Sequence, residues 1–221
     1  MLAAGEGRRL RPLSERWPKA IQPIDGRPVV ATLVRDLGAA GCKRITVVTG
    51  HLAEQVEALL GDGAAFGVDV SYVRQPRPDG SADAVRRAFA GGADTPALVA
   101  AADTVYGRGT FERFLSEWSS APGAVAARLG QPRSGGKPGV DPRLARALPD
   151  PDALTNVPLW GFGSELVPFL DDLPGPPYEL ADGVDRALDA GLDIRGVVVP
   201  ATRDLTDPLD VVRENFTFLD A

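Results

Sequence analysis

Cysteine and histidine are nearly absent from this chain of 221 residues, which contains one of each, Cys42 and His51. A single cysteine cannot form an intrachain disulfide, and one histidine leaves too few ligands for a zinc cage. Any catalysis or ligand binding must therefore use side-chain and backbone groups with oxygen and nitrogen atoms, together with a magnesium ion where one is bound. We expect His51 to be a turn residue rather than a catalytic base, and Cys42 to be a small buried residue.

Long apolar runs are also missing. No stretch approaches the roughly 18 apolar residues that span a membrane, and the first residues lack the apolar core of a signal peptide. Hydrophobic residues at 44% and a mean hydropathy of -0.06 are typical of a globular chain. The 24 basic and 30 acidic residues give a net charge of -6, which argues against nucleic acid or a membrane as partner. We expect a cytoplasmic protein.

The first twenty residues reverse this charge balance, with five basic side chains against two acidic ones. An isolated basic run is usually a solvated tail, but this one is interleaved with Gly5 and Gly7. Glycines let backbone amides approach an anion, so the segment predicts a phosphate-binding loop. It is not a Walker A loop, which ends in Gly-Lys-Ser/Thr. It is not a GxGxxG fingerprint either, because Leu10 takes the place of the third glycine.

Beyond this loop the chain alternates between helix and strand patterns. The alternation predicts an α/β fold, with a doubly wound, mostly parallel sheet in three α/β/α layers. Residues 131–153 are rich in proline and glycine and predict a loop or irregular lid. We expect helices at 26–41, 51–63, 81–92, 109–121, 165–173, 178–191 and 207–220, and strands at 44–50, 68–75, 96–103, 124–130, 154–162 and 193–200.

Polar residues follow several of the expected strands, and ligands of open α/β sheets bind beyond the carboxyl ends of strands. Asp103 ends one strand, and Asp204 comes shortly after another. Two such aspartates can share one magnesium ion with substrate phosphates, because magnesium prefers one or two carboxylates plus phosphate and water oxygens. The alternative for a single aspartate, and the one we favour for Asp204 taken alone, is a helix cap or turn.

Four segments resemble the signature elements of the sugar-1-phosphate nucleotidylyltransferases in order, and together they span nearly the whole chain. They are LAAGEGRRLRPLSERWPKAIQPIDGRPVV, QPRPDGSADAV, AADTVYG and RDLTDPLDVVRENFTFL. The resemblance implies the nucleotide-diphospho-sugar transferase-like fold and a magnesium-dependent reaction. In that reaction a nucleoside triphosphate and a sugar 1-phosphate condense to a nucleotide sugar and pyrophosphate.

The resemblance also implies roles for individual residues. Arg9 and Lys19 would hold phosphates as the catalytic cations, Asp103 and Asp204 would bind Mg²⁺, and Gly139 and Glu179 would contact the sugar. One domain is expected over residues 1–221, with a nucleotide-binding half at 1–120 and a sugar-phosphate-binding half at 121–221. The residues implied for the nucleotide are Leu2, Ala3, Ala4, Gly5, Glu6, Gly7, Arg8, Gln75, Gly80 and Ser81.

The chain departs from the family pattern at several positions. Arg8 replaces a threonine or serine, so that two guanidinium groups are adjacent, and Pro158 stands where a glycine is common. The usual Glu-Lys-Pro element is absent, with Lys137 and Glu179 as its possible substitutes. These departures keep two alternatives open. One is a cytidylyltransferase for phosphocholine or another alcohol phosphate, and the other is an inactive regulatory subunit that binds nucleotide sugars. The base, the sugar and the oligomeric state are left open, with UTP or dTTP favoured over GTP.

Overall fold

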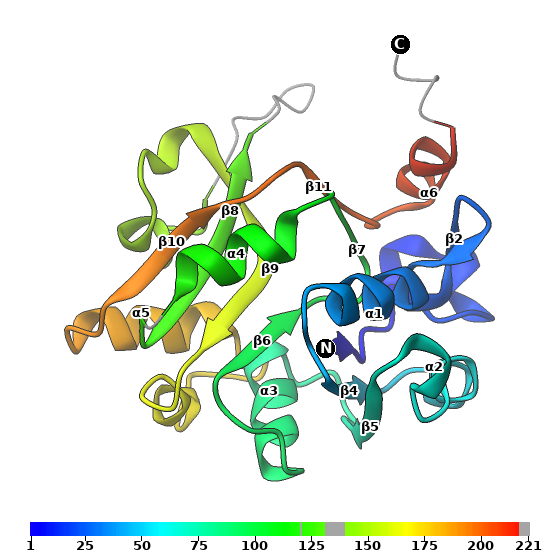
Figure 1. Ribbon diagram of the computed structural model, residues 1–221, viewed down its shortest axis with the longest axis horizontal. Helices are drawn as coiled ribbons and strands as arrows, with labels where there is room; N and C mark the ends of the chain where they lie inside the picture. Colours follow the sequence, from blue (N-terminus) through cyan, green and yellow to red (C-terminus); the bar gives the residue numbers. More distant parts are fainter. Residues whose placement is uncertain (120, 131–139, 217–221) are drawn as a thin grey trace. The chain divides into compact units, whose positions relative to one another are not determined.

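The computed structural model describes residues 1–119, 121–130 and 140–216 of an α/β chain (Figure 1). The chain forms two compact units, which are treated separately. Unit 1 takes the described residues of 1–78, 101–106 and 203–221, and unit 2 those of 79–100 and 107–202. The single domain expected over 1–221, with its halves at 1–120 and 121–221, stays a prediction.

Unit 1 is built on a parallel three-stranded sheet in the order β1 (Leu2–Ala3), β4 (Arg44–Thr49) and β5 (Asp69–Arg74). The apolar run of β4 is buried, with Val47 and Val48 fully covered, as expected for a strand inside a parallel sheet. Helix α1 (Val29–Ala39) precedes β4 along the chain, and α2 (Ala53–Leu60) follows it. These elements confirm the predicted order of helix, strand, helix and strand.

The rest of unit 1 consists of short elements. Strands β2 (Pro23–Ile24) and β3 (Arg27–Pro28) form a hairpin, and β7 (Thr104–Tyr106) pairs with β11 (Thr202–Asp204), whose last two residues belong to this unit. Helix α6 (Pro208–Asn215) begins at a capping box, in which the Asp207 side chain accepts bonds from the backbone N–H groups of Leu209 and Asp210. Asn215 donates from Nδ2 to the Pro23 carbonyl at 2.9 Å, which ties α6 to the hairpin.

Unit 2 contains a mixed four-stranded sheet. Its order is β10 (Ile194–Val198), β8 (Gly123–Leu129), β9 (Leu154–Phe162) and β6 (Ala97–Ala100). Strands β8 and β10 are parallel, whereas β9 runs antiparallel to both β8 and β6. Helix α4 (Thr110–Trp118) packs on β8 and β10 (Figure 1), and α3 (Ser81–Ala90) contacts α5 (Leu180–Asp189). The α/β class is confirmed, with β9 as the strand that makes this sheet mixed.

Pro158 lies in an irregularity of β9. The register with β8 shifts here, because Val125 lies opposite Trp160 while the next residue, Ala126, lies opposite Val157. Pro158 and Leu159 therefore have no residue of β8 opposite them. Proline has no backbone N–H to donate, and within a sheet it is tolerated at such bulges.

Two expected elements differ from the structure. The strand expected at 96–103 ends at Ala100, and Asp103 lies in the turn before β7. The helix expected at 165–173 is only a 3₁₀ turn, Val167–Leu170. Pro168 supplies no N–H, and the prolines at 174, 176 and 177 prevent a longer helix. The described part of the expected loop, residues 140–153, holds two short 3₁₀ turns, Ala145–Ala147 and Pro151–Ala153.

None of the helices within the described ranges combines the length and the apolar character needed to cross a membrane.

Gly161 of β9 offers a test of the core of unit 2. A Cβ atom at this position would lie 2.5 Å from Cδ2 of the buried Trp118 ring, well inside van der Waals contact. We expect Gly161→Ala to lower the free energy of unfolding by roughly 1–3 kcal/mol, measured by urea denaturation. In a Trp118→Leu background the same change should cost less, because the obstructing ring is gone. An equal cost in both backgrounds would contradict this packing argument.

Candidate functional site

The predicted phosphate loop follows β1 as a series of three 3₁₀ turns, Arg8–Leu10, Leu13–Glu15 and Lys19–Ile21. Leu10 anchors the first turn because its side chain is fully buried. Gly7 precedes that turn with a φ of +62°, and an added Cβ would lie 3.1 Å from the Ser14 Cβ. The glycine of the sequence pattern is thus required by left-handed backbone and close packing within the loop itself.

The two adjacent arginines of the loop have different environments. Arg8 is largely exposed and donates from Nε to Oε2 of Glu6 at 2.6 Å. This hydrogen bond lowers the pKa of Glu6 and raises that of Arg8. Arg9 is also exposed, but it has no hydrogen-bonding or ionic partner among the described residues. The charge of Arg8 is therefore balanced inside the loop by Glu6, while Arg9 is available to an anionic ligand.

Lys19, at the end of the loop, contacts the first of the two predicted metal ligands. Its Nζ lies 2.6 Å from Oδ2 of Asp103, and the Lys19 side chain is only 14% exposed. The backbone explains the meeting, because Ala101 bridges to Leu2 of β1 and the Ala102 N–H donates to the Leu2 carbonyl at 2.9 Å. The turn that carries Asp103 is therefore fixed beside the start of the phosphate loop.

The second predicted metal ligand, Asp204, ends β11, and the pairing of β11 with β7 places it beside the turn that carries Asp103. The Leu205 N–H donates to the Asp103 carbonyl at 2.9 Å, and Thr104 donates from Oγ1 to Oδ1 of Asp204 at 2.6 Å. Thr104 is buried, so its hydroxyl fixes one oxygen of Asp204. Burial and the nearby Asp103 and Asp204 raise the pKa of Tyr106 well above its usual value, which keeps this phenol neutral.

The number of carboxylates at this place, Asp103 and Asp204, agrees with what a magnesium site needs. Two carboxylates, one in the turn before β7 and one at the end of β11, match the one or two that magnesium takes when substrate phosphates complete its shell. Across the described ranges, no cluster of three or more histidine, cysteine, aspartate or glutamate side chains forms a complete protein cage. Any magnesium held here would therefore complete its shell with oxygens of a substrate or of water.

A cavity of about 340 Å³ opens at the carboxyl ends of β1, β4 and β5. Three residues predicted to bind the nucleotide, Ala4, Glu6 and Gln75, contribute to its wall. Ligands of open α/β sheets bind at this end of the strands. The remaining lining residues are Gly50, His51, Arg74, Pro76, Arg77 and Pro78.

Gly80 and Ser81, also predicted to bind the nucleotide, belong to unit 2 and contact the segment before α5. Ser81 donates from Oγ to Oε2 of Glu179 at 2.8 Å and accepts the Leu180 N–H at 2.9 Å. Gly80 has a φ of +107°, and a side chain there would collide with the main chain of Tyr178. The structure therefore brings together a predicted nucleotide residue, Ser81, and a predicted sugar residue, Glu179.

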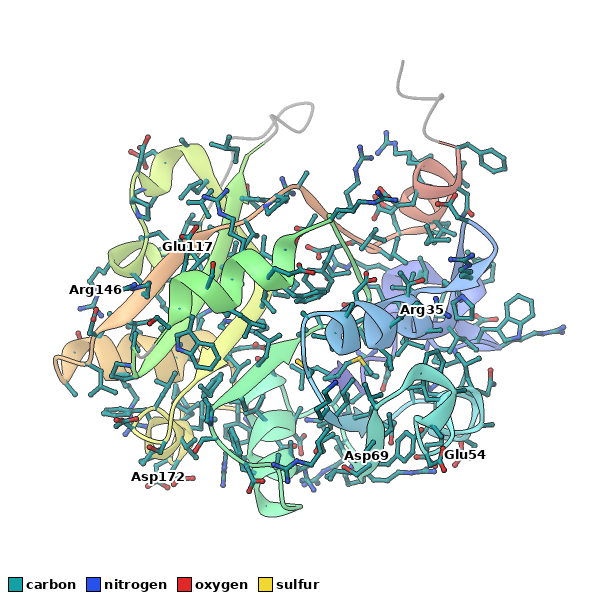
Figure 2. All side chains as sticks on the ribbon, in the orientation of Figure 1. Arg35, Glu54, Asp69, Glu117, Arg146 and Asp172 are labelled. Carbon is teal, nitrogen blue, oxygen red and sulfur yellow. The ribbon has the colours of Figure 1, made fainter. Side chains whose placement is uncertain are left out.

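A run of ion pairs holds the segment after residue 140 on α5. Arg143 bonds both Asp141 and Asp182, the latter at 2.6 Å, and its hydrogen bonds lower the pKa of Asp141. Arg146, labelled in Figure 2, pairs with Asp185 and with Asp189 of the same helix. The aspartates at 182, 185 and 189 recur at helical spacing, so they form one acidic face of α5 opposite the two arginines.

Asn156 is a polar residue of unit 2 that the sequence reading did not single out. Its Oδ1 accepts the Asp141 N–H at 2.5 Å, whereas its buried Nδ2 has no hydrogen-bond partner in the part of the chain that is described. Buried donors without a partner are rare in proteins and call for an acceptor. The sequence signal that could have identified Asn156 is its position in the same strand as Pro158, two residues away. Gly139 and Lys137 lie outside the described residues.

The sequence matches the family described as Nucleotidyl transferase over residues 1–133. A glucose-1-phosphate thymidylyltransferase of Streptomyces griseus is 31% identical over 96% of this chain. A nucleotidyltransferase of low-salt glycan biosynthesis, Agl11 of Haloferax volcanii, is 30% identical over 97% of it. This chain spans 64% of the length of each of these two relatives.

A solved structure from Bacillus anthracis, described as a glucose-1-phosphate thymidylyltransferase in complex with sucrose, superimposes with a TM-score of 0.80. The match covers 100% of this chain and 94% of the other, at 19% sequence identity, and so supports the fold. The family match extends over more than half of the sequence and includes the phosphate loop, Lys19 and Asp103. The chain belongs to the nucleotidyl transferase family.

Proposed function

We propose that the protein is a sugar-1-phosphate nucleotidylyltransferase, which joins a nucleoside triphosphate to a sugar 1-phosphate and releases pyrophosphate. The contact between Lys19 and Asp103 is the observation that carries the proposal. It joins the cationic loop to an acidic turn, and the cavity lined by Ala4 and Gln75 lies at the same end of the sheet of unit 1. A reaction between two anions needs such a combination of fixed cations and carboxylates.

In this reaction an oxygen of the sugar 1-phosphate forms a bond to the α-phosphorus, and the bond from that phosphorus to the β-phosphate oxygen breaks. No protein nucleophile is needed, so the protein positions the reactants and neutralises their charge. Arg9 offers a planar fork for two phosphate oxygens, and Lys19 offers a point charge. Asp103 and Asp204 would hold magnesium, which would neutralise further phosphate charge when bound.

The base of the nucleotide is assigned to the cavity of unit 1. Its volume of about 340 Å³ lies at the lower end of the range for small-molecule pockets. Gln75 is 6% exposed and contributes to the cavity wall, and an amide can both donate to and accept from a base edge. For the sugar we assign Glu179 and also Asn156, whose Nδ2 has no partner among the residues that the structure describes. Gly139 stays a sugar-binding prediction from the sequence.

The names of the relatives select the first substrates to test. The Streptomyces griseus relative is a glucose-1-phosphate thymidylyltransferase, so dTTP with glucose 1-phosphate is the first pair. This choice agrees with the preference for UTP or dTTP over GTP from the sequence. A cytoplasmic location also stays a prediction.

The proposal is tested by measuring pyrophosphate release with magnesium over a grid of nucleoside triphosphates against sugar 1-phosphates. We expect one pair, with dTTP or UTP as donor, to exceed all others. Activity confined to CTP with phosphocholine would instead support the cytidylyltransferase alternative. A silent grid with nucleotide sugars that still raise the melting temperature would support a regulatory subunit.

The cations of the loop provide a sharper test. We expect Arg9→Ala and Lys19→Ala each to reduce turnover by about 100-fold or more, because each removes a fixed charge from the phosphates. Arg11→Ala, in the same loop, and Lys43→Ala, an exposed lysine of unit 1, are the matched controls. Steady-state kinetics on variants with unchanged melting temperatures gives the measurement. Wild-type turnover in either loop variant would exclude the role assigned to that residue.

The aspartates test the metal. We expect Asp103→Asn and Asp204→Asn to raise the magnesium concentration for half-maximal rate at least about tenfold, since each change removes a ligand charge. Removing the metal with EDTA should abolish turnover of the wild type. Asp69→Asn is the control, because Asp69 is an exposed acid at the start of β5. If EDTA leaves the rate unchanged, the metal assignment fails for both aspartates.

A further inference from the structure

The phosphate loop has little secondary structure of its own to hold it. Between β1 and β2 it forms only the three short 3₁₀ turns, and it carries several arginines of like charge. Carbonyl groups inside the loop instead accept hydrogen bonds from side chains. The first of these bonds is internal, from Oγ of the fully buried Ser14 to the Gly7 carbonyl at 2.7 Å.

Two further bonds come from the turn before α2 and from the first turn of that helix. His51 Nε2 lies 3.1 Å from the Ser14 carbonyl, and Gln55 donates from Nε2 to the Arg16 carbonyl at 2.8 Å. A carbonyl can only accept, so the hydrogen of His51 must be on Nε2. The two side chains thus bond two loop carbonyls that lie two residues apart.

His51 also belongs to the wall of the cavity. It lies two residues after the end of β4, and the cavity is lined by His51 together with Gly50 and Gln75. One side chain therefore contacts both the space assigned to the base and the loop assigned to the phosphates. Ser14, whose carbonyl is bonded by His51, donates from its own Oγ to the Gly7 carbonyl. Gly7 directly precedes the 3₁₀ turn Arg8–Leu10.

We infer that His51 and Gln55 are positioning residues that hold the phosphate loop in register with the base cavity of the same unit. This inference rests on the proposed function, in which the loop and the cavity bind one nucleoside triphosphate. The two side chains hold the loop carbonyls in place before the nucleotide arrives, so its phosphates meet a loop whose backbone is already ordered. Displacements of about 1 Å in such a site can cost about 100-fold in rate.

The test compares variants that remove or keep the bond donors. His51→Leu removes a donor, and His51→Gln keeps an amide that can donate. Gln55→Glu replaces the donor by a carboxylate of similar shape. Tyr72→Phe is the matched control, because it deletes a bond from a side chain to the Gly61 carbonyl, 2.6 Å long, at the other end of α2. Melting temperatures show whether each variant is folded.

Binding of dTTP and UTP with magnesium is measured by calorimetry, and amide hydrogen exchange is followed over residues 7–19. We expect His51→Leu and Gln55→Glu to weaken triphosphate binding by about three- to tenfold and to speed exchange in the loop. His51→Gln and Tyr72→Phe should resemble the wild type in both measurements. In active protein, the KM for the triphosphate should rise while the KM for the sugar phosphate stays unchanged.

The inference is overturned if His51→Leu and Gln55→Glu bind triphosphates as tightly as the wild type, or if loop exchange is unchanged in both. A wild type that binds no triphosphate would instead refute the proposed function. The exchange measurement still decides whether His51 and Gln55 hold the loop in that case, so the two failures are distinguishable.

Discussion

The backbone pairing of the two-residue strand β1 is the constraint on which the site depends. The Val48 N–H donates to the Met1 carbonyl on one side, and the Ala102 N–H donates to the Leu2 carbonyl on the other, both at 2.9 Å. Buried backbone groups need such partners, so β1 can only lie between these two segments. The phosphate loop, the turn at His51 and the turn at Asp103 consequently leave the sheet at one end.

Charge is distributed unevenly over this end of unit 1. Glu6 and Asp103 each take up one cation of the loop, Arg8 and Lys19, through contacts of 2.6 Å. Arg9 has no such partner within the described ranges. A ligand with several phosphates would meet this uncompensated guanidinium at once and would have to compete with carboxylates for Arg8 and Lys19. Such competition favours multiply charged ligands over singly charged ones.

The sequence predicted what depends on local pattern. Periodicity located the strands of unit 1 and most helices, and the order of motifs led to Arg9, Lys19 and Asp103. Contacts between segments that are distant in the sequence could not be predicted from it. Nothing local shows that Thr104 bonds Asp204 or that His51 bonds Ser14, because each pair is brought together by strand pairing or loop packing.

The same limit explains the differences in unit 2. Direction is not encoded in an apolar run, so β9 could not be read as antiparallel, and a bulge that accommodates Pro158 is visible only against the register of β8. The aspartates of α5 recur at helical spacing, but their arginine partners, Arg143 and Arg146, lie in a segment without period. The sequence could not show that these arginines face α5.

Gly80 illustrates how a motif residue can carry two kinds of information. It belongs to an element implied to read the nucleotide, yet the main chain of Tyr178 crosses so close that no side chain fits. A glycine retained at this position among divergent descendants would record the crossing of two chain segments, whatever nucleotide those descendants use. Substrate preference is therefore better sought in the side chains of the cavity wall, such as those of Gln75 and Arg77, than in Gly80.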